Sequence, residues 1–269
     1  MTKLTTLFCA AALAFSASAH AGVAPILSGF SQTTVAAEDD GSTLVNLANG
    51  LKLGLNGATY SSLYVNTNGN VSFGQGLSTY APGAFNGDSF GHDFLAPFFG
   101  DVDIRDNHGS IGYGNTMFEG HNAMAVTWSN VGYYNKKNDL QNTFQLVLVD
   151  RSDTGANNFD FYYNYGSIQW DSTSNSDKAH AGFHLQGTAA DFEFDGSGNP
   201  GKVIDSGKQS LVKGSNVGLS GRYAFNVRGG VAAYGLEQLT PAQSVPLPGS
   251  LPLVGIGAIA LAYGRRRKA

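Results

Sequence analysis

Cysteine is almost absent from this chain of 269 residues, and the one cysteine, Cys9, lies close to the N-terminus. Disulfides are therefore excluded as a source of stability for the rest of the protein. Charged residues are also few, at 13% of the sequence. No helix-length window combines a 3.6-residue apolar period with a charged face, so long amphipathic helices are not expected. The fold has to be stabilised by its hydrophobic core alone.

Basic residues are scarce and unevenly placed. Of the 16 Lys and Arg residues, Lys3 and the four at positions 265–268 lie at the two ends, whereas all 20 acidic residues lie between Glu38 and Glu237. Removal of both ends would leave eleven basic and twenty acidic residues, a net charge of −9. This acidic body lacks the basic stripe that nucleic-acid binding requires, so no nucleic-acid partner is expected.

The common catalytic constellations are poorly represented. The body of the chain has no cysteine nucleophile, and His-Glu-x-x-His does not occur. The pair Glu193 and Asp195 could serve glycoside hydrolysis, but such a pair arises by chance among twenty acidic residues. We predict no catalytic residues and no enzyme activity, with a secreted hydrolase as the less favoured alternative. Five histidines are interpreted as surface or hydrogen-bonded core residues: His92, His108, His121, His180 and His184.

Glycine is abundant, with 36 residues, and short apolar or aromatic runs alternate with turn signals every ten to fifteen residues. This pattern predicts an all-β fold of the β-sandwich type. In the run Thr143–Val149, residues Phe144, Leu146 and Leu148 should share one face. Asn68-Gly69 predicts a hairpin turn. Strands are expected at 63–65, 71–73, 94–99, 110–113, 123–128, 143–149, 158–163, 168–170, 181–185, 191–194 and 223–227, with a short helical turn at 206–211.

The N-terminus has the features of a secretory signal peptide. Lys3 supplies the positive charge, Leu4–Phe15 the apolar region, and small residues end the segment at Ala19 or Ala21. We therefore expect residues 1–21 to be removed on export. Cys9 would be discarded with them.

The C-terminus combines three features in order. A proline-containing motif comes first, then the apolar run Leu251–Tyr263, then a basic cluster. A spanning helix needs about 20 apolar residues, so this run would make a short membrane span. The basic cluster would stay on the cytoplasmic side. The motif is Val245, Pro246, Leu247, Pro248 and Gly249, and the basic residues are Arg265, Arg266, Arg267 and Lys268.

This ending resembles the PEP-CTERM sorting signal of Gram-negative bacteria, although Leu247 stands where that pattern has glutamate. The resemblance implies transient anchoring in the inner membrane by the C-terminal helix and cleavage near the motif by an exosortase. The alternative is a plain C-terminal membrane anchor. Residues 232–244 would form a linker, and the sorting signal would occupy residues 245–269.

The middle of the chain resembles the nidogen-like (NIDO) extracellular domain. The resemblance depends on the order of several segments: Ala96-Pro-Phe-Phe-Gly-Asp-Val-Asp103, Gly109–Tyr113, Ala125–Trp128, Asn142–Leu148, Asn158–Tyr163, Ala181–Phe183 and Ser215–Phe225. It covers about residues 93–229 within a single β-rich domain at 22–231, and Tyr64–Phe73 resembles the segment that precedes such domains.

The nidogen-like resemblance implies an exported, non-enzymatic cell-surface or extracellular-matrix protein. Its expected work is cell–matrix adhesion or biofilm formation in association with exopolysaccharide. The expected partners are an exosortase during processing and an extracellular polysaccharide or matrix protein afterwards. An alternative from another class is a carbohydrate-binding module of the exopolysaccharide matrix.

Two groups of residues are candidates for ligand binding. Asp101, Asp103 and Asp106 lie within six positions and offer hard oxygen ligands for Ca²⁺, although the spacing is not that of an EF-hand. The alternative is a capped turn with solvated carboxylates and no cofactor. Aromatic residues could stack on sugars, although most aromatics on alternating strands are core residues. The aromatic group is Trp128, Tyr133, Tyr134, Phe161, Tyr162, Tyr163 and Trp170.

Overall fold

The computed structural model describes residues 25–86, 90–174 and 177–235. The chain divides into two units, and the described residues all belong to the first, which ends at Leu236. The expected signal peptide at 1–21 and the sorting segment at 245–269 lie outside the described residues. Within the described ranges, no helix is long and apolar enough to cross a membrane.

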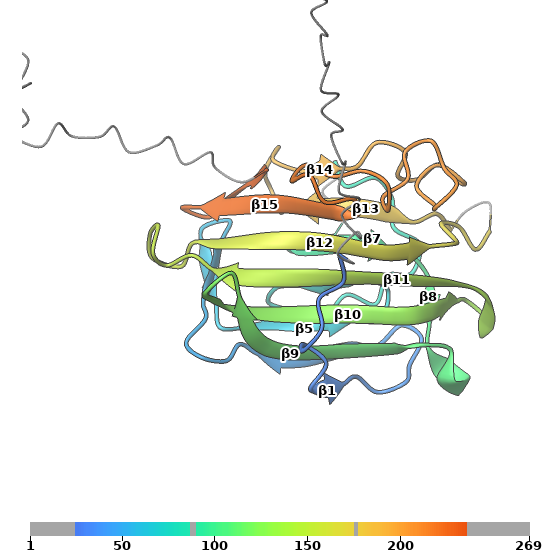
Figure 1. Cartoon of the computed structure of the whole chain (residues 1–269), viewed down its shortest axis with the longest axis horizontal. Coiled ribbons are helices and arrows are strands. Elements are labelled where there is room, and N and C mark those ends of the chain that lie inside the picture. The colour runs from blue at the N-terminus through green and yellow to red at the C-terminus, as the bar shows by residue number, and fades with distance from the viewer. Residues whose placement is uncertain (1–24, 87–89, 175–176, 236–269) are drawn as a thin grey trace, which may run out of the picture. The chain divides into compact units, whose positions relative to one another are not determined.

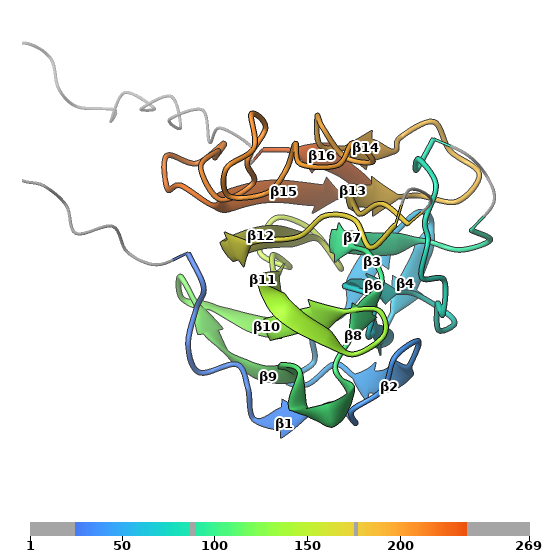
Figure 2. The ribbon, with the colours of Figure 1, turned by 90° about the vertical axis from the view of Figure 1, so that its right-hand side faces the viewer.

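The described chain is all-β and forms two antiparallel sheets that pack as layers, which confirms the predicted fold class (Figures 1 and 2). The larger sheet has the order β1 (Thr33–Thr34), β9 (Ser110–Phe118), β10 (His121–Tyr133), β11 (Lys137–Asp150), β12 (Phe159–Ile168), β15 (Arg222–Arg228) and β16 (Val231–Tyr234), and β8 (Val102–Asp103) also pairs with β10. The smaller sheet has the order β14 (Phe192–Glu193), β13 (His180–His184), β7 (Phe94–Phe99), β6 (Asn70–Ser72), β5 (Ser62–Asn66) and β2 (Ser42–Asn46). A separate hairpin pairs β3 (Leu53–Leu55) with β4 (Ala58–Tyr60).

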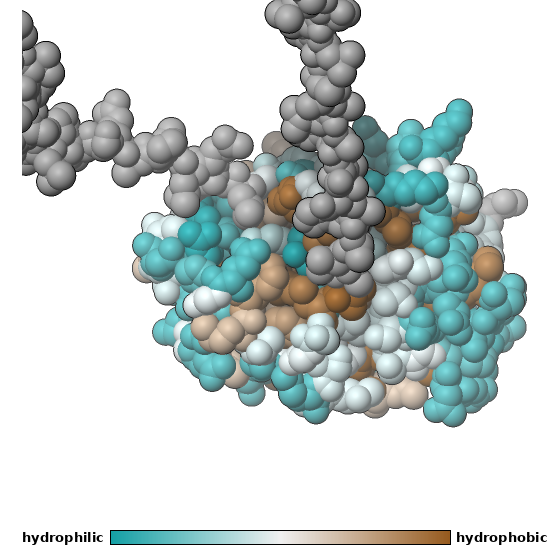
Figure 3. Space-filling model, in the orientation of Figure 1, coloured by the Kyte–Doolittle hydropathy of each residue, from teal (hydrophilic) through white to brown (hydrophobic). Residues whose placement is uncertain are grey.

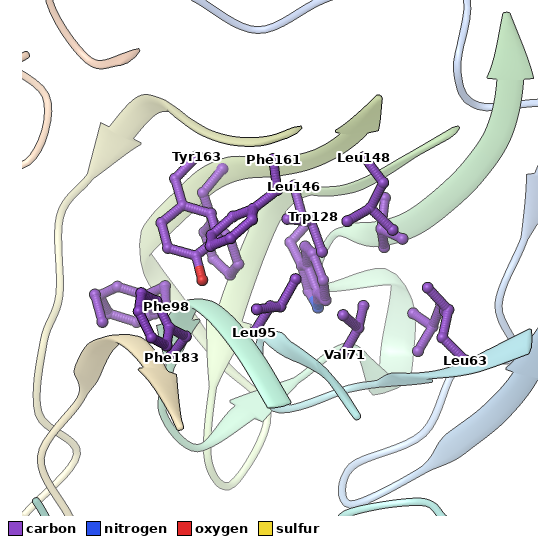
Figure 4. Close-up of a cluster of buried hydrophobic side chains, with 14 of the residues drawn as sticks. Leu63, Val71, Leu95, Phe98, Trp128, Leu146, Leu148, Phe161, Tyr163 and Phe183 are labelled. Carbon is purple, nitrogen blue, oxygen red and sulfur yellow. The ribbon is translucent and has the colours of Figure 1, made fainter. Parts of the chain in front are cut away.

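Alternation along the central strands creates the core between the sheets. Phe144, Leu146 and Leu148 of β11 all point into this core, as their spacing predicts, and none is exposed to solvent. Figure 4 shows Leu146 and Leu148 on the larger sheet facing Leu63, Val71 and Leu95 of the smaller sheet. Each such side chain, once fully buried, contributes about 1.5–3 kcal/mol to stability.

Three aromatic side chains of the larger sheet also bond to the backbone of the opposite layer. The Trp128 indole N–H donates to the carbonyl oxygens of Asn66 at 3.3 Å and Thr67 at 3.1 Å. The Tyr163 hydroxyl donates to the Gly182 carbonyl at 2.6 Å, and the Tyr165 hydroxyl donates to the Pro97 carbonyl at 2.7 Å. Because a buried polar group without a partner is costly, these bonds fix the position of one sheet over the other.

The outer face of the larger sheet is apolar at its middle (Figure 3). Tyr162 points to this face, opposite Tyr163, and is nevertheless only 4% exposed. It belongs to a second apolar cluster with Phe30, Phe118 and Val147, against which Leu27 packs. The alternation of Tyr162 and Tyr163 is as expected, but the outward ring is buried because the N-terminal segment covers it.

The predicted hairpin at Asn68-Gly69 is confirmed, since β5 and β6 pair on either side of it. Its turn is buried rather than solvated: Thr67 and Asn68 are almost fully enclosed. Gly69 has φ +81° and contributes its carbonyl oxygen to the Phe98 N–H at 3.2 Å. The turn therefore packs between the layers, directly beneath Trp128.

Two expectations differ from the structure. Residues 206–211 form turns instead of the expected helical turn, and the one short helix in the described ranges is the 3₁₀ turn η1, Arg105–Asn107. The linker was expected to begin at residue 232, but residues 231–234 form β16, which pairs with β15 at the edge of the larger sheet. Ala232 is buried there and joins the core, so the domain extends beyond its expected end at 231.

Candidate functional site

Asp103 has a structural partner and is not a free ligand. Its carboxylate accepts hydrogen bonds from the Arg105 side chain at 2.8 and 2.5 Å and from the Lys136 backbone N–H at 2.9 Å. Burial alone would raise the pKa of Asp103, but these hydrogen bonds outweigh burial and hold the pKa below its ordinary value. The carboxylate therefore stays ionised and anchors the β8–η1 turn.

Asp106 lies apart from Asp101 and pairs with a lysine. It is on η1 with φ +60°, and its carboxylate lies 2.8 Å from the Lys136 ammonium. The hydrogen bond from Lys136 lowers the pKa of Asp106. The predicted grouping of Asp101 with Asp103 and Asp106 is therefore not the cluster that the fold assembles.

Asp101 instead meets two acidic residues from a distant loop. It follows β7, while Asp39 and Asp40 lie between β1 and β2, and carboxylate oxygens of the three lie within 4.8 Å of one another. Asp101 is only 3% exposed, and it lines a cavity of about 450 Å³ with Asp40, Tyr80, Tyr134 and Asp177. We call this cavity the acidic pocket. The adjacent Asp39 and Asp40 were not recognised from the sequence, because no local pattern links them to Asp101.

Backbone and side-chain bonds hold the loop of Asp39 and Asp40 in place. The Ile104 N–H donates to the Glu38 carbonyl at 3.3 Å, and the Thr67 N–H donates to the Gly41 carbonyl at 2.9 Å. Buried Asn68 donates from Nδ2 to Asp40 Oδ1 at 2.7 Å and accepts from the Val102 N–H at 3.0 Å. The buried turn beneath Trp128 thus also orients the acidic pocket.

Crowding of like charges shifts the pKa values of the carboxyl groups around the acidic pocket. Burial, and then the negative charges of Asp39, Asp40, Asp177 and Asp103, raise the pKa of Asp101 to about 7. Burial and Asp103 also raise the pKa of Asp39, although Arg105 lies 2.7 Å from one of its oxygens and opposes the shift. Because Arg105 neutralises only the Asp39 side of the cluster, the carboxyl group of Asp101 favours either a proton or a bound cation.

We expect Asp101→Asn to stabilise the cation-free protein at high pH. Between about pH 4 and pH 7 the folded state keeps a proton on Asp101 that the unfolded state has lost, so stability falls as pH rises through this window. Removing the carboxylate should flatten that slope and add at least about 1 kcal/mol at pH 8. Urea unfolding at pH 5 and pH 8 in EDTA measures the free energy of unfolding at each pH, and so the slope between them. The exposed Asp106→Asn variant should keep the wild-type slope, and an unchanged slope in Asp101→Asn would contradict the assignment.

Two tyrosines stand at the mouth of the acidic pocket. Tyr80 is 51% exposed and Tyr134 is 54% exposed. The other aromatics considered above are mostly core residues, as expected: Trp128, Phe161, Tyr162, Tyr163 and Trp170 are buried, and Tyr133 is half-buried against Trp170. Within that group, Tyr134 is therefore the residue whose ring is mostly exposed.

A second cavity, of about 550 Å³, contains the carboxylate pair Glu193 and Asp195. Glu193 is engaged on both oxygens, by His180 Nδ1 at 2.5 Å and by the Phe85 N–H at 3.1 Å. Buried His184 likewise lies 2.9 Å from an Asp191 oxygen. These contacts hold β13 against its neighbours, so Glu193 is placed as a structural group.

The sequence also contains one serine pattern that is typical of hydrolases. Gly87-Asp-Ser-Phe-Gly91 matches the Gly-x-Ser-x-Gly pattern of nucleophile elbows. Such an elbow needs a strand before the serine and a helix after it. Here the chain continues from Phe90 into the strand β7, so the helical half of that context is missing. Residues 87–89 lie outside the described ranges, as do the predicted sorting motif at 245–249 and the basic residues 265–268.

Comparison with known proteins identifies one family. The family model of the nidogen-like domain matches residues 61–229. Alpha-tectorin of Mus musculus is 31% identical over 207 residues, which cover 64% of this chain and 9% of alpha-tectorin. Nidogen of Drosophila melanogaster is 26% identical over 200 residues, covering 64% of this chain and 14% of that protein. Nidogen-2 of Mus musculus is 28% identical over 244 residues, covering 76% and 16%.

The chain thus spans only a small part of these relatives. No solved structure matches it. The family match covers more than half of the sequence and includes the hairpin at Gly69, the strands β7 to β15 and Asp101. The protein therefore belongs to the nidogen-like domain family.

Proposed function

We propose that this protein is an exported, non-enzymatic component of the cell surface or extracellular matrix that serves adhesion or biofilm formation. Membership of the nidogen-like family carries the proposal, because that family is associated with extracellular matrix and cell–matrix adhesion. The acidic body and the lack of cysteine outside the N-terminal segment are consistent with a surface protein that folds without disulfides.

The two ends of the sequence support a route to that location. The N-terminal segment at 1–21 would direct export, and the apolar run at 251–263 would hold the protein briefly in the inner membrane. An exosortase would then cut near Val245–Gly249, separating the domain from its basic tail. After cleavage, a matrix polysaccharide or matrix protein is the expected partner.

A carbohydrate-binding function is the second candidate, and the acidic pocket favours it. Tyr80 and Tyr134 expose their rings beside Asp40 and Asp177. Exposed rings can stack on sugar faces, and carboxylates accept hydrogen bonds from sugar hydroxyls. Purified exopolysaccharide alone should bind the protein if this candidate is right, and absence of such binding would leave matrix proteins as the partners.

Deletion of residues 245–269 is expected to abolish retention in the matrix. Without its C-terminal signal, the exported domain should appear mainly in the culture medium, a shift of at least about tenfold in the ratio of medium to matrix. Quantitative immunoblotting of cell, matrix and medium fractions measures this ratio.

Leu247→Glu is the matched control for this deletion. It restores the glutamate of the resembling sorting pattern and keeps both prolines, so it should be retained as well as the wild type. Retention of the deletion variant at the wild-type level would contradict processing through the tail.

A further inference from the structure

The acidic pocket contains carboxylate oxygens that lack partners. Asp101 is almost fully buried and lines the pocket, and among the described residues its carboxylate has neither a hydrogen bond nor an ion pair. Asp39 Oδ1 is also buried without a hydrogen-bond partner. An ionised carboxylate with little access to water and no partner is unfavourable, and a bound cation would stabilise it.

Neighbouring groups orient the acidic residues as ligands. Arg105 lies 2.7 Å from Asp39 Oδ2, whereas Asp39 Oδ1 keeps no hydrogen-bond partner and is left for an ion. The Asn68 amide holds Asp40 through Oδ1 at 2.7 Å. In protein metal sites, groups that hydrogen-bond to a metal-binding side chain hold that side chain in the right orientation. Asp177 adds a fourth carboxylate to the lining, and it is held in its own loop by the Ser174 hydroxyl at 2.6 Å.

The spacing of the oxygens indicates the size of the cation. Ligands lie 2.3–2.6 Å from calcium, so oxygens on opposite sides of the ion are up to about 5 Å apart. Oxygens of Asp39, Asp40 and Asp101 fall within 4.8 Å of one another, which fits such a shell and is too close for a bulky organic cation. The cavity leaves room for water to complete the six to eight ligands that calcium takes.

We propose that Asp39, Asp40 and Asp101 bind one calcium ion, which links the β1–β2 loop to the end of β7. Asp177 would face the ion across the pocket. Tyr80 and Tyr134 would flank the bound ion at the surface. Because the site depends only on the described geometry, it does not depend on the proposed function. Only the expected affinity, about 10⁻⁴–10⁻³ M as in extracellular calcium modules, takes the proposed extracellular location into account.

Calcium should stabilise the purified full-length protein. After treatment with EDTA, addition of 5 mM CaCl₂ should raise the melting temperature by about 3–6 °C, whereas 5 mM MgCl₂ should raise it less. Isothermal titration with CaCl₂ should show one site. Absence of both the thermal shift and the heat in the wild type at 10 mM CaCl₂ would overturn the proposal, and an equal shift with magnesium would overturn the assignment to calcium.

Variants locate the ion. Asp101→Asn keeps the shape of the side chain and should abolish the calcium-dependent shift. Asp40→Asn changes an exposed residue whose loss the fold should tolerate, and it should weaken calcium binding at least tenfold. Asp106→Asn, which removes a carboxylate paired with Lys136 outside the pocket, should bind calcium as the wild type does. Wild-type binding in both Asp101→Asn and Asp40→Asn would overturn the proposed ligand set.

Discussion

Replacing Trp128 by alanine is expected to lower the free energy of unfolding by about 3–5 kcal/mol, the range for removing a large buried aromatic side chain. Trp128 is fully buried, and its ring stacks on Phe144 with centroids 5.1 Å apart and planes 16° apart. Its indole N–H also bonds to the carbonyls of Asn66 and Thr67 in the opposite layer. The substitution would therefore open a cavity and remove the indole donor, leaving the two carbonyls with the Gly69 N–H that they already share.

Urea unfolding followed by circular dichroism measures this loss, since Trp128 itself contributes to the fluorescence signal. Trp128→Phe should cost less than the alanine variant because it keeps most of the apolar area, although it also loses the donor. Tyr134→Ala, at an exposed ring, should change stability by less than about 0.5 kcal/mol. A loss below about 1 kcal/mol in Trp128→Ala would contradict the role of this residue between the sheets.

Gly69→Ala is expected to cost about 2–5 kcal/mol. The positive φ of +81° alone costs an alanine about 1–2 kcal/mol. In addition, a Cβ at this position would overlap the Phe98 carbonyl oxygen and lie 3.1 Å from the Phe144 ring. Overpacking of this kind adds about 1–3 kcal/mol, because the added Cβ would meet backbone atoms and a buried ring rather than the end of a flexible side chain.

Gly57→Ala separates the two contributions. Gly57 has nearly the same φ, +77°, but no atom lies within 4 Å of the position of its missing Cβ. Its substitution should therefore cost only the conformational part, about 1–2 kcal/mol. The same urea titration applied to both variants gives the difference directly. Equal losses would show that the turn at Gly69 is not closely packed.

The central strands could be predicted from the sequence because their alternation is strong and local. The strand predicted at Phe94–Phe99 is confirmed as β7 with the same bounds. The prediction that Phe144, Leu146 and Leu148 of β11 share one face is also confirmed. The hairpin at Gly69 follows from the conformational preference of Asn-Gly. These features depend on residues that are neighbours in the chain, so they can be predicted from one sequence without knowledge of long-range contacts.

Short edge elements and long-range contacts could not be predicted in this way. The strands β1 to β4 and β16 have two to five residues each, too few to show a period. Burial of Tyr162 depends on Phe30 and Leu27, more than 130 positions earlier. Asp39 and Asp40 meet Asp101 across about 60 positions, whereas Asp103 and Asp106 are its neighbours in the sequence, so a local pattern indicates the wrong pair.

The family match likewise begins at residue 61, earlier than the expected start near 93. The added segment contains β5, the buried turn and β6, which supply the carbonyls that accept from Trp128. In the structure this segment is part of the sandwich and not a leader to it. The extent of the β-sandwich therefore agrees with a family domain that begins at residue 61.

Mass spectrometry of the native protein recovered from the matrix tests most directly whether the chain is an exported and processed surface protein. We expect the N-terminus to begin after Ala19 or Ala21 and the C-terminus to end before the apolar run at 251–263. A mature protein that still carries Arg265 to Lys268 would contradict the account.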